Sequence, residues 1–370
     1  MESPQPTLIP PPEPSWREVF LLVVLVFTLH ILLVSRVASF WYVASGWYDN
    51  PWYLQLAATI SNWRLPGGEI AHHFWGFPFS IAVASKVFSM PPLGALVMIS
   101  MLSSLAVCLL VRRLYGGWVA LALYSFINYR WIYTSVEGGS EPLFMCLVFA
   151  AFLAARSDRW NLAALLAALG TTVRPVGIVA LAGLAITLLV RRSYRRLAVI
   201  TLIGLGIGVA YVVPVWIILG SPFANFTLYR EDWGPQGWPL TYPFGALIPS
   251  FLGLLHARWP NVALAAIWLV AAIAGVVVMW LPRNRRRLSP DQGEAWFASI
   301  YTLFYLCYNY ADVFGDLPRF LMPIAPLLLF SLRDSIPRDR RVLWPAALLA
   351  AVLASAAMVG FKNVLGFRVP

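Results

Sequence analysis

Charged residues are scarce in this sequence. Only 12% of its 370 residues are charged, about half of what a soluble domain usually carries, whereas 60% are hydrophobic and the mean hydropathy is +0.73. Such a chain cannot form an ordinary water-facing surface, which excludes a soluble enzyme and a disordered chain. No long segment has a basic polar face, so the net charge of +11 does not indicate nucleic-acid binding. The composition predicts an all-α, polytopic membrane protein.

Several familiar motifs are also absent. The three cysteines lie singly in apolar stretches, so we expect buried side chains rather than a disulfide or a metal site. The sequence has no Walker loop, nucleophile elbow or zinc pattern. Nucleotide-binding and hydrolytic chemistry of those types is therefore not indicated.

Apolar stretches recur along the whole chain, and we expect about 10 to 12 transmembrane helices. Several stretches are shorter than a bilayer crossing, which indicates helices that end beside a cavity. No internal repeat is visible. The candidates are Val19–Ser35, Leu93–Val111, Trp118–Tyr129, Pro142–Ala155, Leu162–Val173, Val176–Val190, Leu197–Leu219, Val262–Leu281, Trp296–Ala311, Phe320–Leu332 and Val342–Phe361.

Arginine clusters between these stretches set the expected topology. Placed in the cytoplasm by the positive-inside rule, they carry most of the net charge. Residues 1–15 are then a disordered, proline-rich cytoplasmic tail, and residues 16–370 form one integral-membrane domain. The outer loops are about 36–75, 130–141, 221–259 and 312–319. The stretch Phe74–Phe88 leaves one crossing unassigned: either it re-enters the interface, or Arg112–Arg113 faces outward.

The first outer loop holds the most distinctive acidic residue, Asp49, within a cluster of aromatic side chains. Asp49 or Asn50 suits an N-cap and Pro51 the first turn of a helix. The spacing from Trp52 onward predicts an amphipathic helix lying in the membrane interface. Asp49 would then sit at headgroup depth, either as a helix cap alone or as a catalytic carboxylate.

A second candidate is the segment Glu137-Gly-Gly-Ser-Glu141, which leads into an apolar helix. Its two carboxylates could bracket a polar substrate or a divalent cation, or could simply cap the helix start. Tyr53 and His73 are further candidates for substrate contacts. The adjacent pair His72-His73 would not share a helix face and does not predict a metal site.

Two arginines are candidates for binding a phosphate. Arg174 interrupts a long apolar run beside Pro175, and an arginine at mid-membrane costs about 2.5–3.5 kcal/mol, so we expect it to line a cavity or its outer mouth. Arg319 begins an apolar helix in a similar setting. A guanidinium binds phosphate through paired hydrogen bonds, whereas the alternative for both is interfacial snorkelling.

The order of five short motifs resembles that of the GT-C glycosyltransferases, most closely the PIG-V-type mannosyltransferases. They lie at Tyr48–Ala57, Phe74–Phe79, Ser140–Phe144, Thr172–Gly177 and Arg319–Leu327. The resemblance implies transfer of a sugar, such as mannose, from a polyprenyl-phosphate donor to a lipid, glycan or protein acceptor. It matches Asp49 to the catalytic acid of the first outer loop, Glu141 to the Ser-Glu motif and Arg174 to the Arg-Pro motif.

These observations combine into one expected mechanism. Asp49 acts as general base on an acceptor hydroxyl, Arg174 and Arg319 hold the lipid phosphate, and Glu141 with Glu137, Tyr53 and His73 binds sugar or acceptor. The reaction inverts the anomeric carbon on the extracytoplasmic side of a prokaryotic plasma membrane, or in the ER lumen if the protein is eukaryotic. The alternatives are a secondary transporter and a non-catalytic subunit of a glycosylation complex; mid-membrane ionisable groups would favour the transporter.

Overall fold

The computed structural model describes residues 12–46, 49–62, 73–126, 129–228, 238–255, 259–281, 293–310 and 313–364. Within these ranges the regular structure is helical, apart from one isolated bridge between Leu240 and Tyr308, which confirms the predicted all-α class. The elements are α1 (Trp16–Ser35), α2 (Phe40–Ser45), α3 (Asn50–Ser61), α4 (Gly76–Val87), α5 (Pro92–Tyr115), α6 (Gly117–Phe126), α7 (Tyr129–Val136), α8 (Ser140–Arg156), α9 (Trp160–Val173), η2 (Pro175–Gly177), α10 (Ile178–Val190), α11 (Tyr194–Leu219), α12 (Ala224–Leu228), α13 (Leu247–Leu255), α14 (Trp259–Trp280), α16 (Gly293–Leu306), α17 (Val313–Phe320), η4 (Met322–Ile324), α18 (Ala325–Ser331) and α19 (Arg340–Val364).

Six helical segments among the described residues are long and apolar enough to cross a membrane, so this is an integral membrane protein. A seventh crossing results if α7 and α8, which meet at 95°, form one broken span. The described residues thus contain fewer helices of full crossing length than the 10 to 12 transmembrane helices that the sequence predicts. The reason is that α4, α9 and α10 are apolar but short. The six segments are Trp16–Ser35, Pro92–Tyr115, Tyr194–Leu219, Val262–Trp280, Val313–Ser331 and Arg340–Ala357.

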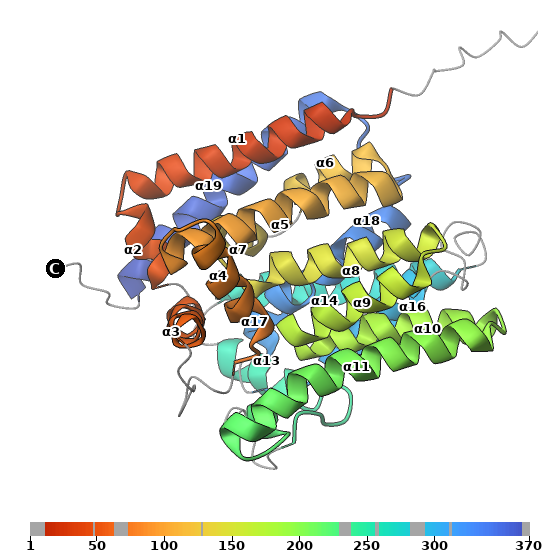
Figure 1. The fold of residues 1–370 in the computed structure, drawn as a ribbon. Coiled ribbons are helices and arrows are strands. Elements are labelled where there is room, and N and C mark those ends of the chain that lie inside the picture. The colour runs from red at the N-terminus through yellow and green to blue at the C-terminus, as the bar shows by residue number, and fades with distance from the viewer. Residues whose placement is uncertain are drawn as a thin grey trace, which may run out of the picture.

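Several arginines of the described ranges gather at one end of the helices. Arg112 donates to the carbonyl of Pro14, just before α1, and Arg156 donates to the carbonyl of Leu114. Arg340 pairs with Glu18 at the start of α1. In Figure 1 the start of α1 and the turns after α8 and α10 lie at the right, whereas α2 and α3 lie at the left. These described charges thus lie at one end of the helices, and the side of the membrane that this end faces stays a prediction.

The position of Arg112 also resolves the unassigned crossing. Since Arg112 lies beside the residues that precede α1, α1 and α5 run in opposite directions between the same two ends. The intervening helix α4 has 12 residues, about 18 Å in length, which is too short to span a hydrocarbon core of about 30 Å. Of the two interpretations, the re-entrant one agrees with the structure.

The predicted disordered tail lies partly outside the described residues, which begin at residue 12. The part that is described makes specific contacts: the Glu13 carboxylate accepts a hydrogen bond from the Gly117 amide at 2.8 Å, and Ser15 caps α1. Residues 63–72, with His72, and residues 229–237 of the expected outer loops also lie outside the described ranges.

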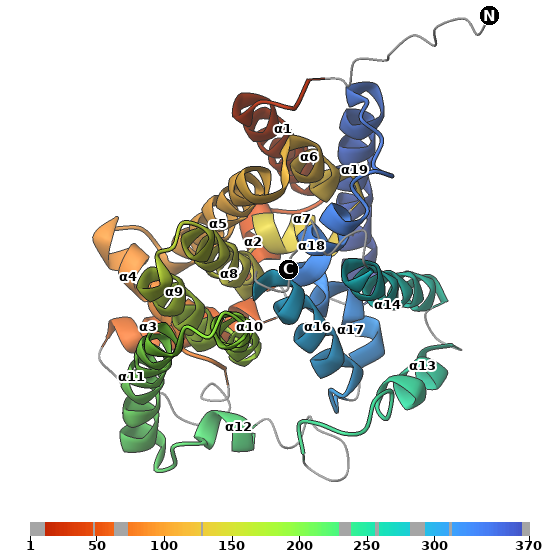
Figure 2. The ribbon, with the colours of Figure 1, turned by 90° about the vertical axis from the view of Figure 1, so that its right-hand side faces the viewer.

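Viewed along the helices, the elements form three groups around a shared hydrophobic core. Figure 2 shows α1, α6 and α19 together, α14, α16 and α17 in a second group, and α8 to α11 with α4 in a third. Buried side chains from α1 to α19 belong to one continuous core. The site described next lies where α3, α8, η2 and α17 converge.

Candidate active site

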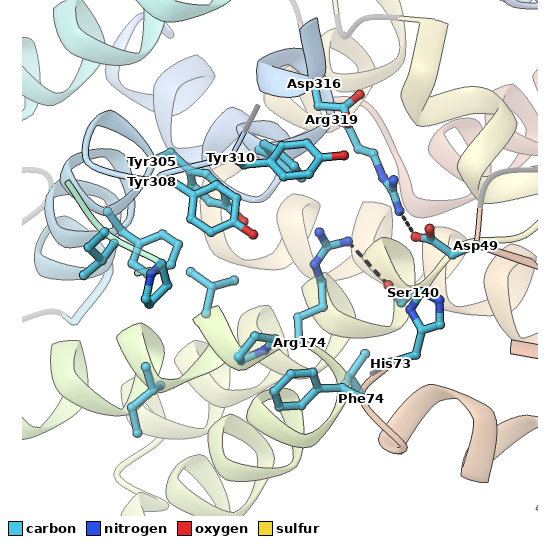
Figure 3. A pocket seen from close by; sticks show the side chains of 18 of the residues that line it. Asp49, His73, Phe74, Ser140, Arg174, Tyr305, Tyr308, Tyr310, Asp316 and Arg319 are labelled. Carbon is cyan, nitrogen blue, oxygen red and sulfur yellow. Dashed lines mark hydrogen bonds and ion pairs between the residues drawn. The ribbon is translucent and has the colours of Figure 1, made fainter. Parts of the chain in front are cut away.

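A cavity of about 400 Å³ lies at the end of the molecule opposite the arginine clusters. Its lining residues come from seven stretches between Asp49 and Phe320, a grouping that no single motif would reveal. Figure 3 shows two guanidiniums in this space, with tyrosines on one side and Asp49 on the other. The polar and aromatic lining residues are Asp49, Tyr53, His73, Phe74, Ser140, Arg174, Phe304, Tyr305, Tyr308, Tyr310, Asp316, Arg319 and Phe320.

Asp49 precedes α3 at the N-cap position, but its side chain does not cap the helix. One carboxylate oxygen instead accepts a hydrogen bond from Arg319 at 2.7 Å, and the hydroxyl of Tyr53 lies 3.5 Å away. The Asp49 side chain is 30% exposed, so it is accessible from the cavity. The capping-only interpretation therefore disagrees with the geometry.

The neighbouring residue Asn50 fixes this loop. Its buried side-chain amide donates to the carbonyls of Ala44, at 2.8 Å, and Glu137, at 3.0 Å. These bonds tie the start of α3 to α2 and to the segment before α8. The carboxylate of Asp49 is thus presented from a braced backbone.

Glu141 joins the two arginines of the cavity. Its carboxylate oxygen Oε1 accepts from Arg319 Nε and lies 2.5 Å from an Arg174 guanidinium nitrogen. Only 1% of the Glu141 side chain is exposed, and it does not line the cavity. Glu141 therefore lies behind the two guanidiniums and holds them, rather than facing the space that a substrate would enter.

Arg174 reaches the cavity because its helix ends at this residue. Its backbone is extended, with φ −142° and ψ 129°, as expected for a residue that precedes a proline. After Pro175 and one turn of 3-10 helix, α10 begins. The guanidinium contacts Glu141 and, at 3.4 Å, the Ser140 hydroxyl.

The start of α8 depends on a glycine. Gly138 has φ +112°, a conformation that L side chains rarely adopt, and a Cβ atom there would lie 1.9 Å from Leu96. This turn directs Ser140 toward Tyr53, whose hydroxyl donates to it at 3.2 Å. The sequence Glu137-Gly-Gly-Ser-Glu141 thus encodes the geometry of one wall of the cavity.

The surroundings of Asp49 favour its ionised form. Burial raises the pKa of its carboxyl, but attraction by Arg319, His73 and Arg174 outweighs burial and lowers the pKa from 3.8 to about 2. Burial and the nearby Asp49 carboxylate raise the pKa of Tyr53. At neutral pH the site therefore presents a carboxylate and an un-ionised tyrosine hydroxyl.

The structure brings Asp49, Tyr53, His73, Arg174 and Arg319 into one cavity, as expected from the sequence. The ring of His73 packs against that of Tyr53, with centroids 5.2 Å apart.

Glu137 is placed differently from the expectation that it binds substrate. Its side chain is fully buried and pairs with His30 of α1 at 2.8 Å, and His30 also bonds Ser355 of α19 at 2.9 Å. Glu137 does not line the cavity, because the turn at Gly138 separates its side chain from that of Ser140. It instead links the turn between α7 and α8 to α1 and, through His30, to α19.

The sequence interpretation missed the aromatic wall and Asp316. Tyr305 stacks on Phe320 at 4.9 Å and Tyr308 on Tyr310 at 6.0 Å, opposite Asp49. Asp316 accepts from Arg130 at 2.6 Å. The spacing of Tyr301, Tyr305 and Tyr308, four and three residues apart, was the available signal, since such positions share a helix face.

A divalent cation stays a prediction. The carboxylates of Asp49 and Asp316 line the cavity, and each is paired with an arginine. Over the ranges that the structure describes, no group of three His, Cys, Asp or Glu side chains converges.

Comparison with solved structures shows the fold of an archaeal enzyme. The oligosaccharyltransferase of Archaeoglobus fulgidus in complex with Zn and sulfate matches with a TM-score of 0.50 and 13% identity, covering 91% of this chain and 53% of that one. Its apo form matches with a TM-score of 0.49 and 13% identity, covering 93% and 56%. The chain thus spans about half the length of these structures. No curated protein sequence matches it.

A family model for glycosyltransferase family 87 matches residues 74–308. A membrane glycosyltransferase is the class predicted from the order of the motifs, and that class is confirmed; the PIG-V-type branch stays a prediction. Because the match spans more than half of the chain, the protein belongs to glycosyltransferase family 87.

Proposed function

We propose that this membrane glycosyltransferase transfers a sugar from a polyprenyl-phosphate donor to an acceptor hydroxyl, with a GT-C type of fold and inversion at the anomeric carbon. The observation that carries the proposal is the pair of guanidiniums, Arg174 and Arg319, facing the same cavity as the Asp49 carboxylate. Guanidiniums suit the phosphate of a leaving group, and a carboxylate suits the proton of an attacking hydroxyl.

The expected reaction is a single displacement. The acceptor oxygen bonds to the anomeric carbon while the bond from that carbon to the phosphate oxygen breaks. The hydroxyl proton goes to Asp49, and polyprenyl phosphate leaves with its charge held by Arg174 and Arg319. Since one displacement occurs at the anomeric carbon, its configuration inverts.

Competition for Arg319 supports Asp49 in the role of base. In the structure Arg319 bonds Asp49, and this interaction is one cause of the low pKa of that carboxyl. A donor phosphate that recruits Arg319 weakens this interaction and raises the pKa of Asp49. The Asp49 carboxylate thereby becomes a stronger base only when the donor is bound. Without donor it stays ionised, and with donor it accepts the proton of the acceptor hydroxyl more readily.

The location of the cavity supports an extracytoplasmic reaction. The cavity lies at the end of the helices away from the arginine clusters, and those clusters face the cytoplasm under the positive-inside rule. In a prokaryote the site that we propose is at the outer face of the plasma membrane. The sugar we favour is a hexose such as mannose, and the acceptor is a lipid, glycan or protein hydroxyl.

The test is sugar transfer by Asp49→Asn, purified in lipid vesicles and supplied with polyprenyl-phosphate sugars and with lipid, glycan and peptide acceptors that carry hydroxyl groups. Removing a general base is expected to slow transfer by about 10² to 10⁴-fold, while asparagine keeps the side-chain volume. Asp158→Asn is the matched control, because Asp158 pairs with Arg196 in an exposed position at the other end of the molecule. Near-normal transfer by Asp49→Asn would contradict the role of Asp49 as general base, whereas absence of transfer by the purified wild type would favour a non-catalytic subunit.

A further inference from the structure

A second, almost wholly apolar cavity of about 660 Å³ lies between α10 and α11. Apart from Thr201, its walls carry no polar side chain. The lining residues are Ile178, Leu181, Ala182, Ala185, Ile200, Thr201, Gly204, Leu205, Gly208, Val209, Val212, Val213, Trp216, Pro222 and Phe223. We refer to it as the α10–α11 groove.

The groove adjoins the candidate active site at one residue. Ile178, the first residue of α10, lines both cavities, and it lies one helical turn beyond Arg174. The active-site cavity also contacts the helix that forms one wall of the groove: Phe74 stacks on Tyr211 of α11, with ring centroids 5.7 Å apart. The groove therefore begins beside the cavity that Arg174 lines, close enough for a chain attached to a phosphate there.

The groove has the length and the surface of a lipid-chain site. Its lining positions on α11 run from Ile200 to Trp216, about 24 Å at the helical rise per residue. Several of its apolar side chains are strongly exposed, including Leu205 at 60% and Val209 at 59%. Covering such surface with hydrocarbon is favourable by about 25 cal/mol per Å².

Glycines keep the groove open. A Cβ atom added at Gly204 would contact Leu181 at 3.5 Å, and one added at Gly208 would meet nothing within 4 Å. Gly206 also faces open space but does not line the groove, since two residues along a helix turn the side chain by about 200°. The alternate glycines of α11 thus include two that face the groove and one that faces away.

We infer that the α10–α11 groove binds the prenyl tail of the lipid-phosphate donor. This inference rests on the proposed function, because the phosphate on Arg174 and Arg319 is what selects a phosphate-anchored chain over an ordinary membrane acyl chain. Gly208 then acts in tail binding, since any larger side chain at this position occupies the space of the tail. The groove supplies affinity for long-chain donors, whereas Asp49 and the two arginines act on the head.

The test compares Gly208→Phe with Gly206→Phe, each assayed with a long-chain polyprenyl-phosphate sugar and with a short-chain analogue of the same sugar. Gly208→Phe should lower kcat/KM for the long-chain donor by about tenfold or more, which corresponds to at least about 1.4 kcal/mol, and leave the short-chain donor unaffected. Gly206→Phe should change neither. Normal use of the short donor also shows that the variant is folded.

A second readout does not depend on turnover. A polyprenyl phosphate with a photoreactive group in its tail should label α10 and α11 in the wild type and in Gly206→Phe, and not in Gly208→Phe. Equal behaviour of the two variants would overturn the inference, and so would labelling of other helices. The inference would also be overturned if a photoreactive phospholipid gave the same labelling and polyprenyl phosphate did not displace it. Failure of the wild type to use any polyprenyl-phosphate sugar would refute the proposed function instead, and labelling would still test the groove.

Discussion

Glu141→Gln should uncouple the two arginines of the cavity with almost no change in shape. In the wild type one carboxylate oxygen of Glu141 contacts both Arg174 and Arg319, and 1% of its side chain is exposed. Glutamine is isosteric but carries no charge, so two neighbouring guanidiniums lose their shared anion. Arg319 retains Asp49 at 2.7 Å, so Arg319 does not become isolated.

The size of the effect follows from the burial of these groups. Breaking a buried ion pair costs about 3–5 kcal/mol, and we expect the lower end because Asp49 remains paired with Arg319. A similar loss in positioning the groups that stabilise the leaving phosphate, about 3 kcal/mol, slows transfer by about two orders of magnitude. The assays are the Tm of the purified protein and kcat for sugar transfer from a polyprenyl-phosphate donor.

A matched variant separates stability from function. Glu294 is 2% exposed and pairs at 2.8 Å with Arg156, which is 26% exposed, at the opposite end of the molecule, so Glu294→Gln removes the charge of a buried, arginine-paired carboxylate far from the cavity. Both variants should lower Tm by a similar amount, and only Glu141→Gln should lower kcat. Equal transfer rates in the two variants would refute the assignment of Glu141 as a positioning residue for Arg174 and Arg319.

Two further predictions follow from the buried charges. Because the pKa of Asp49 is lowered from 3.8 to about 2 in the folded protein, its ion pair contributes stability that is complete above about pH 4 and is lost as pH falls toward 2. The Tm difference between wild type and Asp49→Asn, followed from pH 7 to pH 2, should therefore stay constant and then shrink; a difference that grows on acidification would contradict this. His30→Leu removes a partner of the buried Glu137 and should cost about 3 kcal/mol in stability, much of which His30→Leu with Glu137→Leu should restore. Thermal unfolding of the two single variants and the double variant measures these changes in stability. Strictly additive losses from the two substitutions would contradict an energetic coupling between His30 and Glu137.

Local patterns were sufficient to predict the helices and the main polar residues of the site. Each of the eleven apolar stretches overlaps helical structure, since long apolar runs can satisfy their backbone only as helices in a membrane, although Trp296–Ala311 continues past the end of α16 at Leu306. Asp49, Arg174 and Arg319 were identifiable because a charged group beside an apolar run is costly and a proline or an aromatic cluster marked its place.

The relations between distant residues could not be predicted in this way. Glu137 and Glu141 are equivalent in the sequence, four residues apart beside glycines, yet one pairs with His30 of α1 and the other with Arg174 and Arg319. Their partners come from other helices, so only tertiary packing decides between them. The same holds for Tyr305 and Tyr308, whose place opposite Asp49 depends on how α16 packs against α17.

The central claim is that the protein uses a lipid-phosphate-linked sugar, and its most direct test is donor consumption by the purified wild type. The protein in lipid vesicles is incubated with a panel of polyprenyl-phosphate sugars and nucleotide sugars together with lipid, glycan and peptide acceptors that carry hydroxyl groups, and each donor, its leaving group and the glycosylated acceptor are quantified by mass spectrometry. We predict loss of one polyprenyl-phosphate hexose with release of an equal amount of polyprenyl phosphate and no consumption of any nucleotide sugar. Consumption of a nucleotide sugar, with the polyprenyl-phosphate sugars left intact, would contradict the account.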